Sequence, residues 1–501
     1  MKNSTADNNS AKVQTPSDCI NNRTVYGKFR EIVDRYPDMP AVIEDDRQLT
    51  FAQLDHLADG ILSKFYDRQP SLVGIVMSHG VNQIAAMLAV LKSGAGYVPA
   101  EPFLPKDRID YMMKTAGVDF IIDDQYCSQI PKAISQMPDR SRPDGIAYIL
   151  FTSGTTGRPK GVVIENHSVA NYAEAFAEEM HVGPGDIMLQ FSICSFDIFV
   201  EEVFASLLNS VAVAIPTPEI HDGSKEQLMK FCDRHQVTIL DGFPYLLADL
   251  NKRPSMLPES VSLIISGGDV VRENYINRLR KRGVRIYNTY GPSETTVCSN
   301  YYRIDNAKPL PDGTYPVGRK IKGVDVKIMD ADLREVAPGE IGEICITGEG
   351  VGRGYIGNPP EQANFVTLPD GTRLYRSGDL GYVLPDGNIA FLHRKDDQVM
   401  ILGRRVEPDE VENVLNEFAD IDRGVVRAFE DENGLHYLVA YIVPRKNFSL
   451  SALRSWMASK LADFMIPEYF VKLKEIPVTH RGKVDTKALP VVLKTGDYAK
   501  D

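Results

Sequence analysis

The sequence predicts an α/β protein, in which a large N-terminal region of doubly wound sheets adjoins a small β-rich subdomain and a small mobile α+β C-terminal cap. Helical stretches alternate with short apolar runs over 24–265, which is typical of doubly wound sheets. Between about 317 and 395 the alternation gives way to short strand-like segments broken by glycine. Residues 396–501 have helices and strands of their own, and a chain of 501 residues exceeds one ordinary core.

The expected elements can be placed in chain order. In the first region the expected strands are 72–77, 120–122, 211–215, 238–240 and 263–265, and the expected helices are 82–93, 197–209 and 224–235. The β-rich subdomain is expected to contain strands at 325–329, 342–347 and 387–392. The cap is expected to contain helices at 407–418 and 450–461 and strands at 424–428 and 437–443. These assignments divide the chain into a disordered tail (1–18), an N-terminal core (19–395) and a C-terminal cap (396–501).

Composition and charge disfavour several classes of protein. The net charge of −12 argues against nucleic acid or an anionic membrane as the main partner. Six cysteines lie far apart without a CxxC pair, which is typical of reduced thiols and not of a disulfide framework or a zinc site. The first eighteen residues are polar and predict no signal peptide, and the longest apolar run, 84–91, is too short to span a bilayer. We therefore expect a soluble, cytoplasmic enzyme.

The most informative segment is the loop Phe151-Thr-Ser-Gly-Thr-Thr-Gly-Arg-Pro-Lys-Gly161. It follows an apolar run and precedes a helix expected from about 166 to 180, so a strand, a turn, a lysine and a helix are predicted to form a phosphate cradle. Gly154 and Gly157 are expected to take positive φ and bring backbone N–H groups close to an anion. Further donors are Lys160 and the hydroxyl groups of Thr152, Ser153, Thr155 and Thr156. Gly161 excludes a Walker A motif, and an ordinary surface turn is the alternative.

Further motifs follow in a fixed order. They are Leu49-Thr-Phe51, Leu91-Lys-Ser-Gly-Ala-Gly-Tyr-Val-Pro99, Asn288-Thr-Tyr-Gly-Pro-Ser-Glu-Thr-Thr296, Gly342-Glu-Ile-Cys-Ile-Thr-Gly348, Tyr375-Arg-Ser-Gly-Asp379, His393-Arg-Lys-Asp396, Gly403-Arg-Arg-Val-Glu407 and Arg481-Gly-Lys483. This order, over about 25–490, resembles the adenylate-forming superfamily, and most closely the amino-acid adenylation domains of nonribosomal peptide synthesis.

The resemblance implies that a carboxylate attacks the α-phosphorus of ATP and that pyrophosphate leaves. A carboxylate is already ionised at neutral pH, so the enzyme must position two anions and neutralise the charge between them. By resemblance, 152–160 holds the β- and γ-phosphates and Glu294 helps bind Mg²⁺. Tyr290 stacks on adenine, Asp379 accepts both ribose hydroxyls, and Arg394 lies near the ribose and phosphates. Lys483 is the catalytic lysine. Taken singly, Tyr290 could be a core aromatic, Asp379 a turn residue and Lys483 a solvated lysine.

The cap is expected to rotate after adenylation. Asp396 matches the family's hinge position, and rotation would withdraw Lys483 and bring the 398–406 loop toward a phosphopantetheine thiol. The sequence departs from the family at this loop, because Met400 and Leu402 stand where basic residues are common and His393 replaces a frequent glycine. These departures bear on how the loop meets a carrier protein.

The substrate pocket is assigned by resemblance, and its acidic residues indicate a substrate class. Asp197 matches the carboxylate that binds the substrate α-ammonium, and Glu201 lies one helical turn further on. Asp241 matches another specificity position at the end of a strand. The other expected pocket residues are Ile198, Ile265, Gly267, Thr289, Val297 and Cys298, with Lys483 closing the set. Buried carboxylates need a partner, so the pocket predicts a basic amino acid such as lysine, with ornithine, arginine or β-lysine left open. Alternatively, Glu201 pairs with a protein arginine or lies on the surface and Asp241 caps a turn, which favours a polar uncharged substrate.

Partners and competing functions follow from the same residues. The chain carries no condensation domain or Gly-Gly-x-Ser carrier motif, so we expect it to be freestanding and to load a carrier protein in trans. The alternatives are an acyl-CoA or aryl-acid ligase of the same superfamily and a catalytically silent nucleotide-binding protein. Asp197 argues against the ligase, and Lys160, Glu294, Asp379 and Lys483 together argue against the silent protein.

Overall fold

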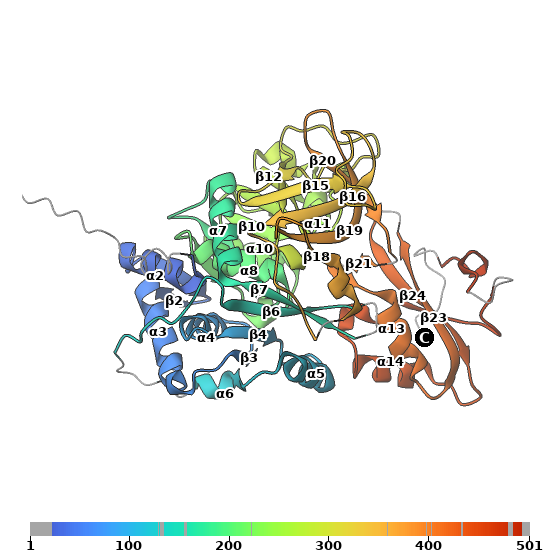
Figure 1. Cartoon of the computed structure of the whole chain (residues 1–501), viewed down its shortest axis with the longest axis horizontal. Coiled ribbons are helices and arrows are strands. Elements are labelled where there is room, and N and C mark those ends of the chain that lie inside the picture. Colours follow the sequence, from blue (N-terminus) through green and yellow to red (C-terminus); the bar gives the residue numbers. More distant parts are fainter. Residues whose placement is uncertain are drawn as a thin grey trace, which may run out of the picture.

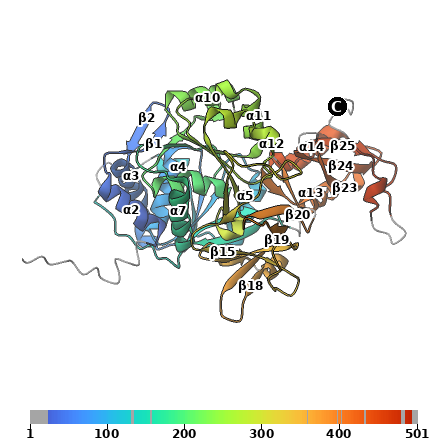
Figure 2. The same ribbon diagram turned by 90° about the horizontal axis from the view of Figure 1, so that it is seen from above.

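The computed structural model describes residues 23–492 except 129, 131–134, 155–157, 222, 358, 397, 402, 432–433 and 479–483, and it leaves out the side chain of Lys487. Figures 1 and 2 show two large sheets with their helices at one end of the molecule, a smaller β-rich subdomain beside them and the cap at the other end. The predicted α/β fold class is confirmed.

The larger sheet has nine strands in the order β14-β13-β12-β11-β10-β8-β9-β1-β2. Strands β8 to β12 and β1 run parallel to their neighbours in this sheet, while β2, β13 and β14 add antiparallel edges. The strands are β1 (Pro40–Glu44), β2 (Arg47–Thr50), β8 (Ile187–Leu189), β9 (Ala212–Ile215), β10 (Ile239–Gly242), β11 (Leu263–Ser266), β12 (Arg285–Tyr290), β13 (Asn300–Arg303) and β14 (Arg319–Lys320).

The second sheet has six strands in the order β17-β7-β6-β4-β3-β5. Its strands are β3 (Leu72–Val76), β4 (Gly96–Ala100), β5 (Phe120–Asp123), β6 (Ile146–Thr152), β7 (Lys160–Glu165) and β17 (Gly354–Ile356). Strand β7 corrects the sequence prediction, because an antiparallel strand stands between the 151–161 loop and the helix that begins at Asn166. The run Gly161-Val-Val-Ile is rich in β-branched residues, which favours a strand.

Helices cover the sheets and fill the space between them. They are α2 (Val25–Arg35), α3 (Phe51–Ser63), α4 (Val81–Lys92), α5 (Lys106–Ala116), α6 (Asp124–Cys127), α7 (Asn166–Met180), α8 (Asp197–Val200), α9 (Pro218–His221), α10 (Lys225–Arg234), α11 (Pro244–Lys252) and α12 (Glu273–Ile276). Every residue of α4 except Asn82 is buried, because this helix lies in the core that the two sheets share. The helix predicted at 197–209 contains a π turn, η2 (Glu201–Ala205), and such turns are frequent at functional sites.

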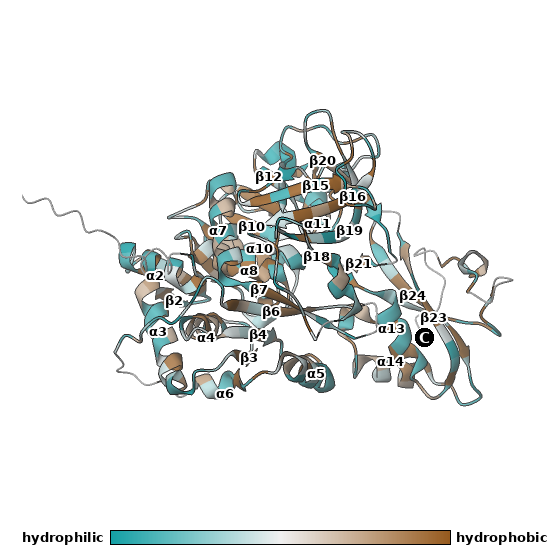
Figure 3. Cartoon of the chain, viewed as in Figure 1, coloured by the Kyte–Doolittle hydropathy of each residue, from teal (hydrophilic) through white to brown (hydrophobic). Residues whose placement is uncertain are grey.

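The β-rich subdomain and the cap each have a sheet of their own. The subdomain contains β15 (Val324–Met329), β16 (Gly342–Gly348), β18 (Phe365–Thr367), β19 (Arg373–Val383) and β20 (Ile389–Arg394). The cap contains the hairpin β21 (Val399–Ile401) and β22 (Arg404–Val406), the sheet β23 (Ile421–Glu430), β24 (His436–Pro444) and β25 (Tyr469–Lys472), and the helices α13 (Pro408–Asn416) and α14 (Leu450–Ala458). Figure 3 shows that β15 and β16 are largely hydrophobic, as expected of strands that line a core.

Candidate functional site

A cavity of about 630 Å³ lies where the core, the β-rich subdomain and the cap meet. The parallel strands β10, β11 and β12 end at its wall, and open α/β sheets bind ligands at the carboxyl ends of their strands. The segment before α8, the end of β20 and the β21–β22 hairpin complete the lining. Residues from three parts of the chain therefore converge on one site.

The predicted phosphate loop joins β6 to β7 as part of a β-hairpin, in which Thr152 pairs with Lys160. Gly154 does not take positive φ, contrary to the prediction. Glycine is required there because a Cβ atom would lie 2.4 Å from the carbonyl oxygen of Arg158. The predicted residues Thr155, Thr156 and Gly157 lie outside the described residues.

Lys160 is buried at the start of β7, with 4% of the residue exposed. Its ammonium lies 3.8 Å from Glu361 and 4.8 Å from the ring centroid of Tyr355. Burial lowers its pKa, and the nearby guanidinium of Arg405 lowers the pKa further. A buried lysine with one carboxylate at the limit of ion-pair distance can bind an anion without first giving up a short ion pair.

Glu294 is fully buried in the short turn that follows β12. Its carboxylate accepts a hydrogen bond of 2.5 Å from the Tyr355 hydroxyl, and Nη1 of Arg405 lies 3.2 Å from both of its oxygens. Burial alone would raise the pKa of Glu294, but Arg405 and Lys160 hold it at about 2. A carboxylate that stays ionised beside a phosphate loop is a suitable oxygen ligand for a divalent cation.

The backbone after Glu294 is strained in a way that sequence motifs do not reveal. Thr296 and Val297 both have positive φ, 62° and 65°, although both are β-branched. The strain is offset by hydrogen bonds, from Thr296 Oγ1 to the carbonyl of Gly350 at 2.7 Å and from the N–H of Ser299 to the carbonyl of Tyr290 at 2.7 Å. This turn brings Val297 and Cys298 to the cavity wall.

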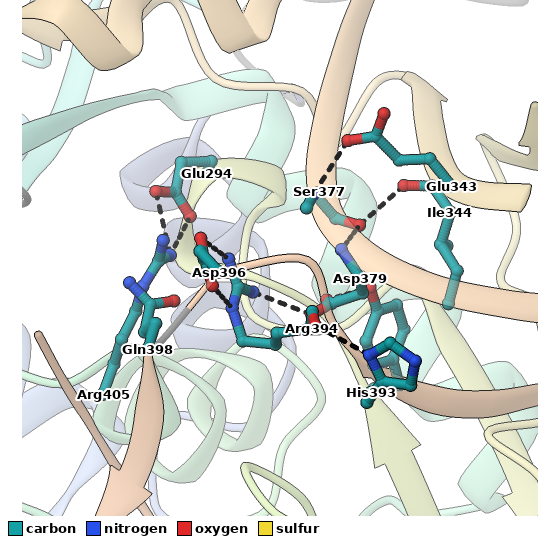
Figure 4. A network of polar contacts seen from close by, with 12 residues as sticks. Glu294, Glu343, Ile344, Ser377, Asp379, His393, Arg394, Asp396, Gln398 and Arg405 are labelled. Carbon is teal, nitrogen blue, oxygen red and sulfur yellow. Dashed lines mark hydrogen bonds and ion pairs between the residues drawn. The ribbon is translucent and has the colours of Figure 1, made fainter. Parts of the chain in front are cut away.

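Asp379, Tyr290 and Arg394 form one network, which Figure 4 shows in part. The Tyr290 hydroxyl donates to Asp379 Oδ2 at 2.6 Å, and Arg394 Nη1 donates to Asp379 Oδ1 at 2.7 Å. Arg394 also donates to both carboxylate oxygens of Asp396, at 2.7 and 2.9 Å. The predicted nucleotide-binding residues and the predicted hinge residue are therefore in direct contact.

Sequence reasoning missed the way in which the β21–β22 hairpin enters the site. Besides pairing with Glu294, Arg405 accepts through its carbonyl a 3.0 Å hydrogen bond from Ser153 Oγ. Arg404 points elsewhere, with its guanidinium 4.7 Å from the ring centroid of Phe464 and 5.4 Å from that of Phe196. Met400 also lines the cavity. Leu402 lies outside the described residues.

The pocket end of the cavity is acidic. Of the residues expected to bind the substrate, those that line the cavity are Asp197, Ile198, Glu201, Asp241, Gly267, Thr289, Val297 and Cys298. Ile265 does not, because its side chain is fully buried in the core behind β11. Burial raises the pKa of Asp197 to about 6, although a hydrogen bond from Ser293 opposes this. Lys483 lies outside the described residues.

Glu201 and Asp241 are neither exposed nor paired with arginine. Each is 2% exposed, and within the described ranges no lysine or arginine forms an ion pair with either of them. Glu201 accepts a hydrogen bond from the Tyr172 hydroxyl, and its carboxyl group is within hydrogen-bonding reach of Asp241. The alternative for Glu201, as an exposed or arginine-paired residue, is therefore wrong in the described part of the chain, and the alternative for Asp241, as a residue that caps a turn, is not tested by its burial.

Glu202, which the sequence analysis did not select, holds the loop that leads to Asp197. It is fully buried and accepts hydrogen bonds from the backbone N–H groups of Phe191 and Ser192, the Ser192 hydroxyl and the Gln190 amide. The sequence did contain a signal for Glu202. It is an acidic residue within an apolar helical run, and a carboxylate that is buried in such a run needs hydrogen-bond partners.

We expect the substitution Glu202→Ala to lower the midpoint of thermal unfolding by about 2–3 °C, because two backbone N–H groups lose their acceptor at a cost of about 2 kcal/mol. Differential scanning fluorimetry measures this shift. The control is Glu178→Ala, which removes an exposed glutamate on α7 that pairs with Lys322. Equal midpoints for the two variants would contradict the role given to Glu202.

Other sequence expectations concern metals, cysteines and membranes. The described residues contain no group of three or more His, Cys, Asp or Glu side chains arranged to hold a metal ion. Five cysteines in the described ranges are buried and free, while Cys19 lies outside them. None of the helices in the part of the chain that the structure describes is long and apolar enough to cross a membrane.

Comparison with known proteins gives the same family that the motifs indicate. A profile of the AMP-binding enzyme family matches residues 29–356, more than half of the chain, and one of the AMP-binding enzyme C-terminal domain matches residues 410–483. The chain is 35% identical over 487 residues to bacitracin synthase 2 of Bacillus licheniformis. The match covers 94% of this chain and 19% of that synthase, so the chain spans a small part of the length of this relative.

Two solved structures share the fold. NpsA-ThdA, an artificially fused Adenylation-PCP di-domain NRPS from Klebsiella oxytoca, has a TM-score of 0.83 at 24% identity, over 90% of this chain and 93% of that chain. Holo-PA1221, an NRPS protein containing adenylation and PCP domains bound to a vinylsulfonamide inhibitor, has a TM-score of 0.82 at 25% identity, over 93% of this chain and 83% of that chain. The chain therefore belongs to the AMP-binding enzyme family, the adenylate-forming superfamily that its motifs resemble.

Proposed function

We propose that the protein is an ATP-dependent, AMP-forming ligase that activates a basic amino acid as its adenylate, releases pyrophosphate, and passes the aminoacyl group to the phosphopantetheine thiol of a separate carrier protein. The observation that carries the proposal is a single cavity lined by both Asp197 and Asp379. One carboxylate is suited to a substrate ammonium, and the other to ribose hydroxyls. An acid without an ammonium would leave Asp197 buried and unpaired, which argues against an acyl-CoA or aryl-acid ligase.

Adenylation requires the two reacting anions to approach each other. Lys160 and Arg394 supply positive charge near the phosphates, and Lys483 is proposed to bridge the attacking carboxylate and the α-phosphate as the catalytic lysine. Asp379, which already accepts from Tyr290 and Arg394, is proposed to accept the ribose hydroxyls, while the Tyr290 ring stacks on adenine. The residues hold the reactants in line and need no general base, because the substrate carboxylate is ionised.

Mg²⁺ fits this site through Glu294. The carboxylate is fully buried, and the hydroxyl of Tyr355 and the guanidinium of Arg405 keep it ionised and oriented. Bound Mg²⁺ supplies neutralising charge to the phosphate oxygens. Glu294 would hold it together with the nucleotide, after the Arg405 side chain has moved aside.

The basic substrate is supported by the acidic end of the pocket. Glu201 and Asp241 are buried beside Asp197 and have no cation from the described part of the chain. A second ammonium on the substrate would pair with them and satisfy their oxygens, which a neutral side chain would do less well. Lysine has the required charge, and ornithine, arginine and β-lysine share it.

Transfer to a carrier protein is supported by the position of the cap hairpin and by a relative, and the arrangement in trans is part of the proposal. Arg405 and Ser153 join the hairpin to the phosphate loop, which suits a stage after pyrophosphate has left. Asp396, held by Arg394, is proposed as the hinge between the core at 19–395 and the cap at 396–501. The 25% identical relative contains an adenylation and a PCP domain, and a PCP is a carrier domain.

Pyrophosphate release tests the proposal. Purified protein with ATP and Mg²⁺ is offered basic, polar, acidic, apolar and aryl acids, and release is expected with lysine or another cationic amino acid. The variant Lys483→Ala should lose at least about 100-fold in rate, whereas Lys474→Ala, which removes an exposed lysine of the same cap, should not. Release with aryl or fatty acids and coenzyme A would support the acyl ligase. No release with any acid would support the silent nucleotide-binding protein.

A further inference from the structure

Two carboxyl groups face each other at the end of the substrate pocket. Glu201 opens the π turn η2 and Asp241 lies on β10, and each is 2% exposed. Glu201 Oε2 accepts the Tyr172 hydroxyl, whereas Glu201 Oε1 and Asp241 Oδ2 have no hydrogen-bond donor in the described part of the protein. The two groups are nevertheless within hydrogen-bonding reach of each other. One proton between them would satisfy both unpartnered oxygens.

The surroundings favour such a shared proton, because the titratable groups packed around the pair in the described part of the chain are acidic or neutral. They are Tyr172 on α7, Asp197 on α8, Glu202 on η2, Cys298 after the strained turn and Tyr301 on β13. Two adjacent carboxylates without a cation cannot both remain ionised in a buried site. Burial raises the pKa of Glu201 to about 7, and burial and the charge of Glu201 raise that of Asp241 well above its ordinary value.

We propose that Glu201 and Asp241 share one proton in the empty pocket and that the cationic side chain of the substrate displaces this proton to solvent on binding. The inference rests on the proposed function, since it assumes that the pocket takes a basic amino acid. Before binding, the pair with its shared proton carries one negative charge. After binding, the two carboxylates and the substrate ammonium together carry one negative charge, and the displaced proton is in solvent. Tyr172 acts as a positioning residue, because its hydroxyl fixes one oxygen of Glu201 and leaves the other for Asp241.

The proposal gives the pocket a pH-dependent selectivity. At pH values below the pKa of the shared proton, a cationic ligand must displace that proton. Its apparent affinity should therefore fall by about tenfold for each unit by which the pH is lowered. Above that pKa both carboxyl groups are ionised, the cation binds without proton release, and the affinity no longer depends on pH. A neutral side chain of the same length does not displace the proton, so its affinity should lack this dependence.

Calorimetry with the full-length protein measures the proton directly. L-lysine and L-norleucine are titrated between pH 6 and pH 8.5 in two buffers that differ in ionisation enthalpy, which gives the protons released per ligand. Both ligands carry an α-ammonium, so any proton lost from Asp197 is common to the two. We expect L-lysine to release up to about one proton more than L-norleucine at the acidic end of the range, with the difference vanishing as the pH rises.

Two variants link the released proton to the pair. The double variant Glu201→Gln/Asp241→Asn removes both carboxyl groups and should abolish the extra proton released by lysine. Tyr172→Phe removes a donor that favours ionised Glu201, so the pH midpoint of the extra release should rise by about one unit. The matched control is Tyr97→Phe, because Tyr97 is 1% exposed and its hydroxyl has no hydrogen-bond partner in the described ranges.

The possible failures are distinguishable. If lysine supports pyrophosphate release but releases no more protons than norleucine at any pH, the shared proton is wrong and the proposed function stands. If the extra release persists in the double variant Glu201→Gln/Asp241→Asn, the proton comes from another group and the proposal is overturned. If no cationic amino acid supports pyrophosphate release, it is the proposed substrate class that fails.

Discussion

The substitution Asp197→Asn is expected to lower kcat/KM for amino-acid-dependent pyrophosphate release by about 100- to 1,000-fold, which corresponds to about 3–4 kcal/mol. Asparagine has nearly the same shape, so the loss reports the charge. In the proposed complex the substrate α-ammonium enters a buried site against this carboxylate, and in the variant it would be buried with its main counterion removed. The assay is steady-state pyrophosphate release with lysine as the varied substrate.

Two controls separate this loss from a general defect. ATP affinity, measured by equilibrium binding, should remain within about threefold of the native value, because the proposed nucleotide contacts come from other residues. Asp233→Asn removes an exposed carboxylate on α10 and should leave kcat/KM unchanged. An Asp197→Asn variant with near-native kcat/KM would contradict the assignment of the ammonium site.

The substitution Arg405→Ala is expected to reduce transfer to the carrier thiol far more than adenylation. In the orientation described, Arg405 is the guanidinium that pairs with the fully buried Glu294. Its removal leaves the buried Glu294 carboxylate without its ion-pair partner whenever the hairpin is docked, which costs about 3–4 kcal/mol and should lower the docked population by about 100- to 1,000-fold. Fluorescence energy transfer between labels on the core and the cap measures that population, and thioester formation on a carrier measures the consequence.

The same hairpin offers a matched control for the loss of a charge. Arg404 is adjacent, but it stacks over Phe464 instead of contacting Glu294, so Arg404→Ala should cost about 1 kcal/mol. Arg405→Lys should restore part of the effect, because it keeps the charge without the fork of donors. Equal losses in Arg404→Ala and Arg405→Ala, or equal losses of adenylation and transfer in Arg405→Ala, would contradict this role.

The sequence predicted those features that depend on local pattern. The alternation of apolar runs predicted the sheets and helices to within a few residues, as for β3, β11 and α10. The order of the motifs indicated the family, and the spacing of Asp197 and Glu201 placed both in one cavity. The 151–161 loop was selected for its glycines and hydroxyl groups, although the strand β7 after it was not foreseen.

The remaining features depend on contacts between distant residues. The pairing of Arg405 with Glu294 joins positions 111 apart, and nothing in either motif encodes the orientation of the cap that brings them together. The surroundings of Glu201 and Asp241, in which the described residues supply no cation, depend on α7, β10 and η2 at once. Two local predictions failed for the same reason. Gly154 is required by the close approach of the Arg158 carbonyl and not by a positive φ, and the side chain of Ile265 on β11 points into the core and not into the cavity. Both outcomes depend on tertiary packing.

The central claim is that the protein joins a basic amino acid to AMP, and detecting that product tests it most directly. Native protein is incubated with ATP, Mg²⁺ and L-lysine, and in parallel with each of the other acids of the panel, and the quenched mixtures are analysed by mass spectrometry for the acyl-adenylate. We predict a lysyl-adenylate, or that of a closely related cationic amino acid, formed with native protein and not with Lys483→Ala. An adenylate of a neutral or acidic amino acid in its place, an adenylate of an acid without an amino group, or no adenylate with any acid, would contradict the account.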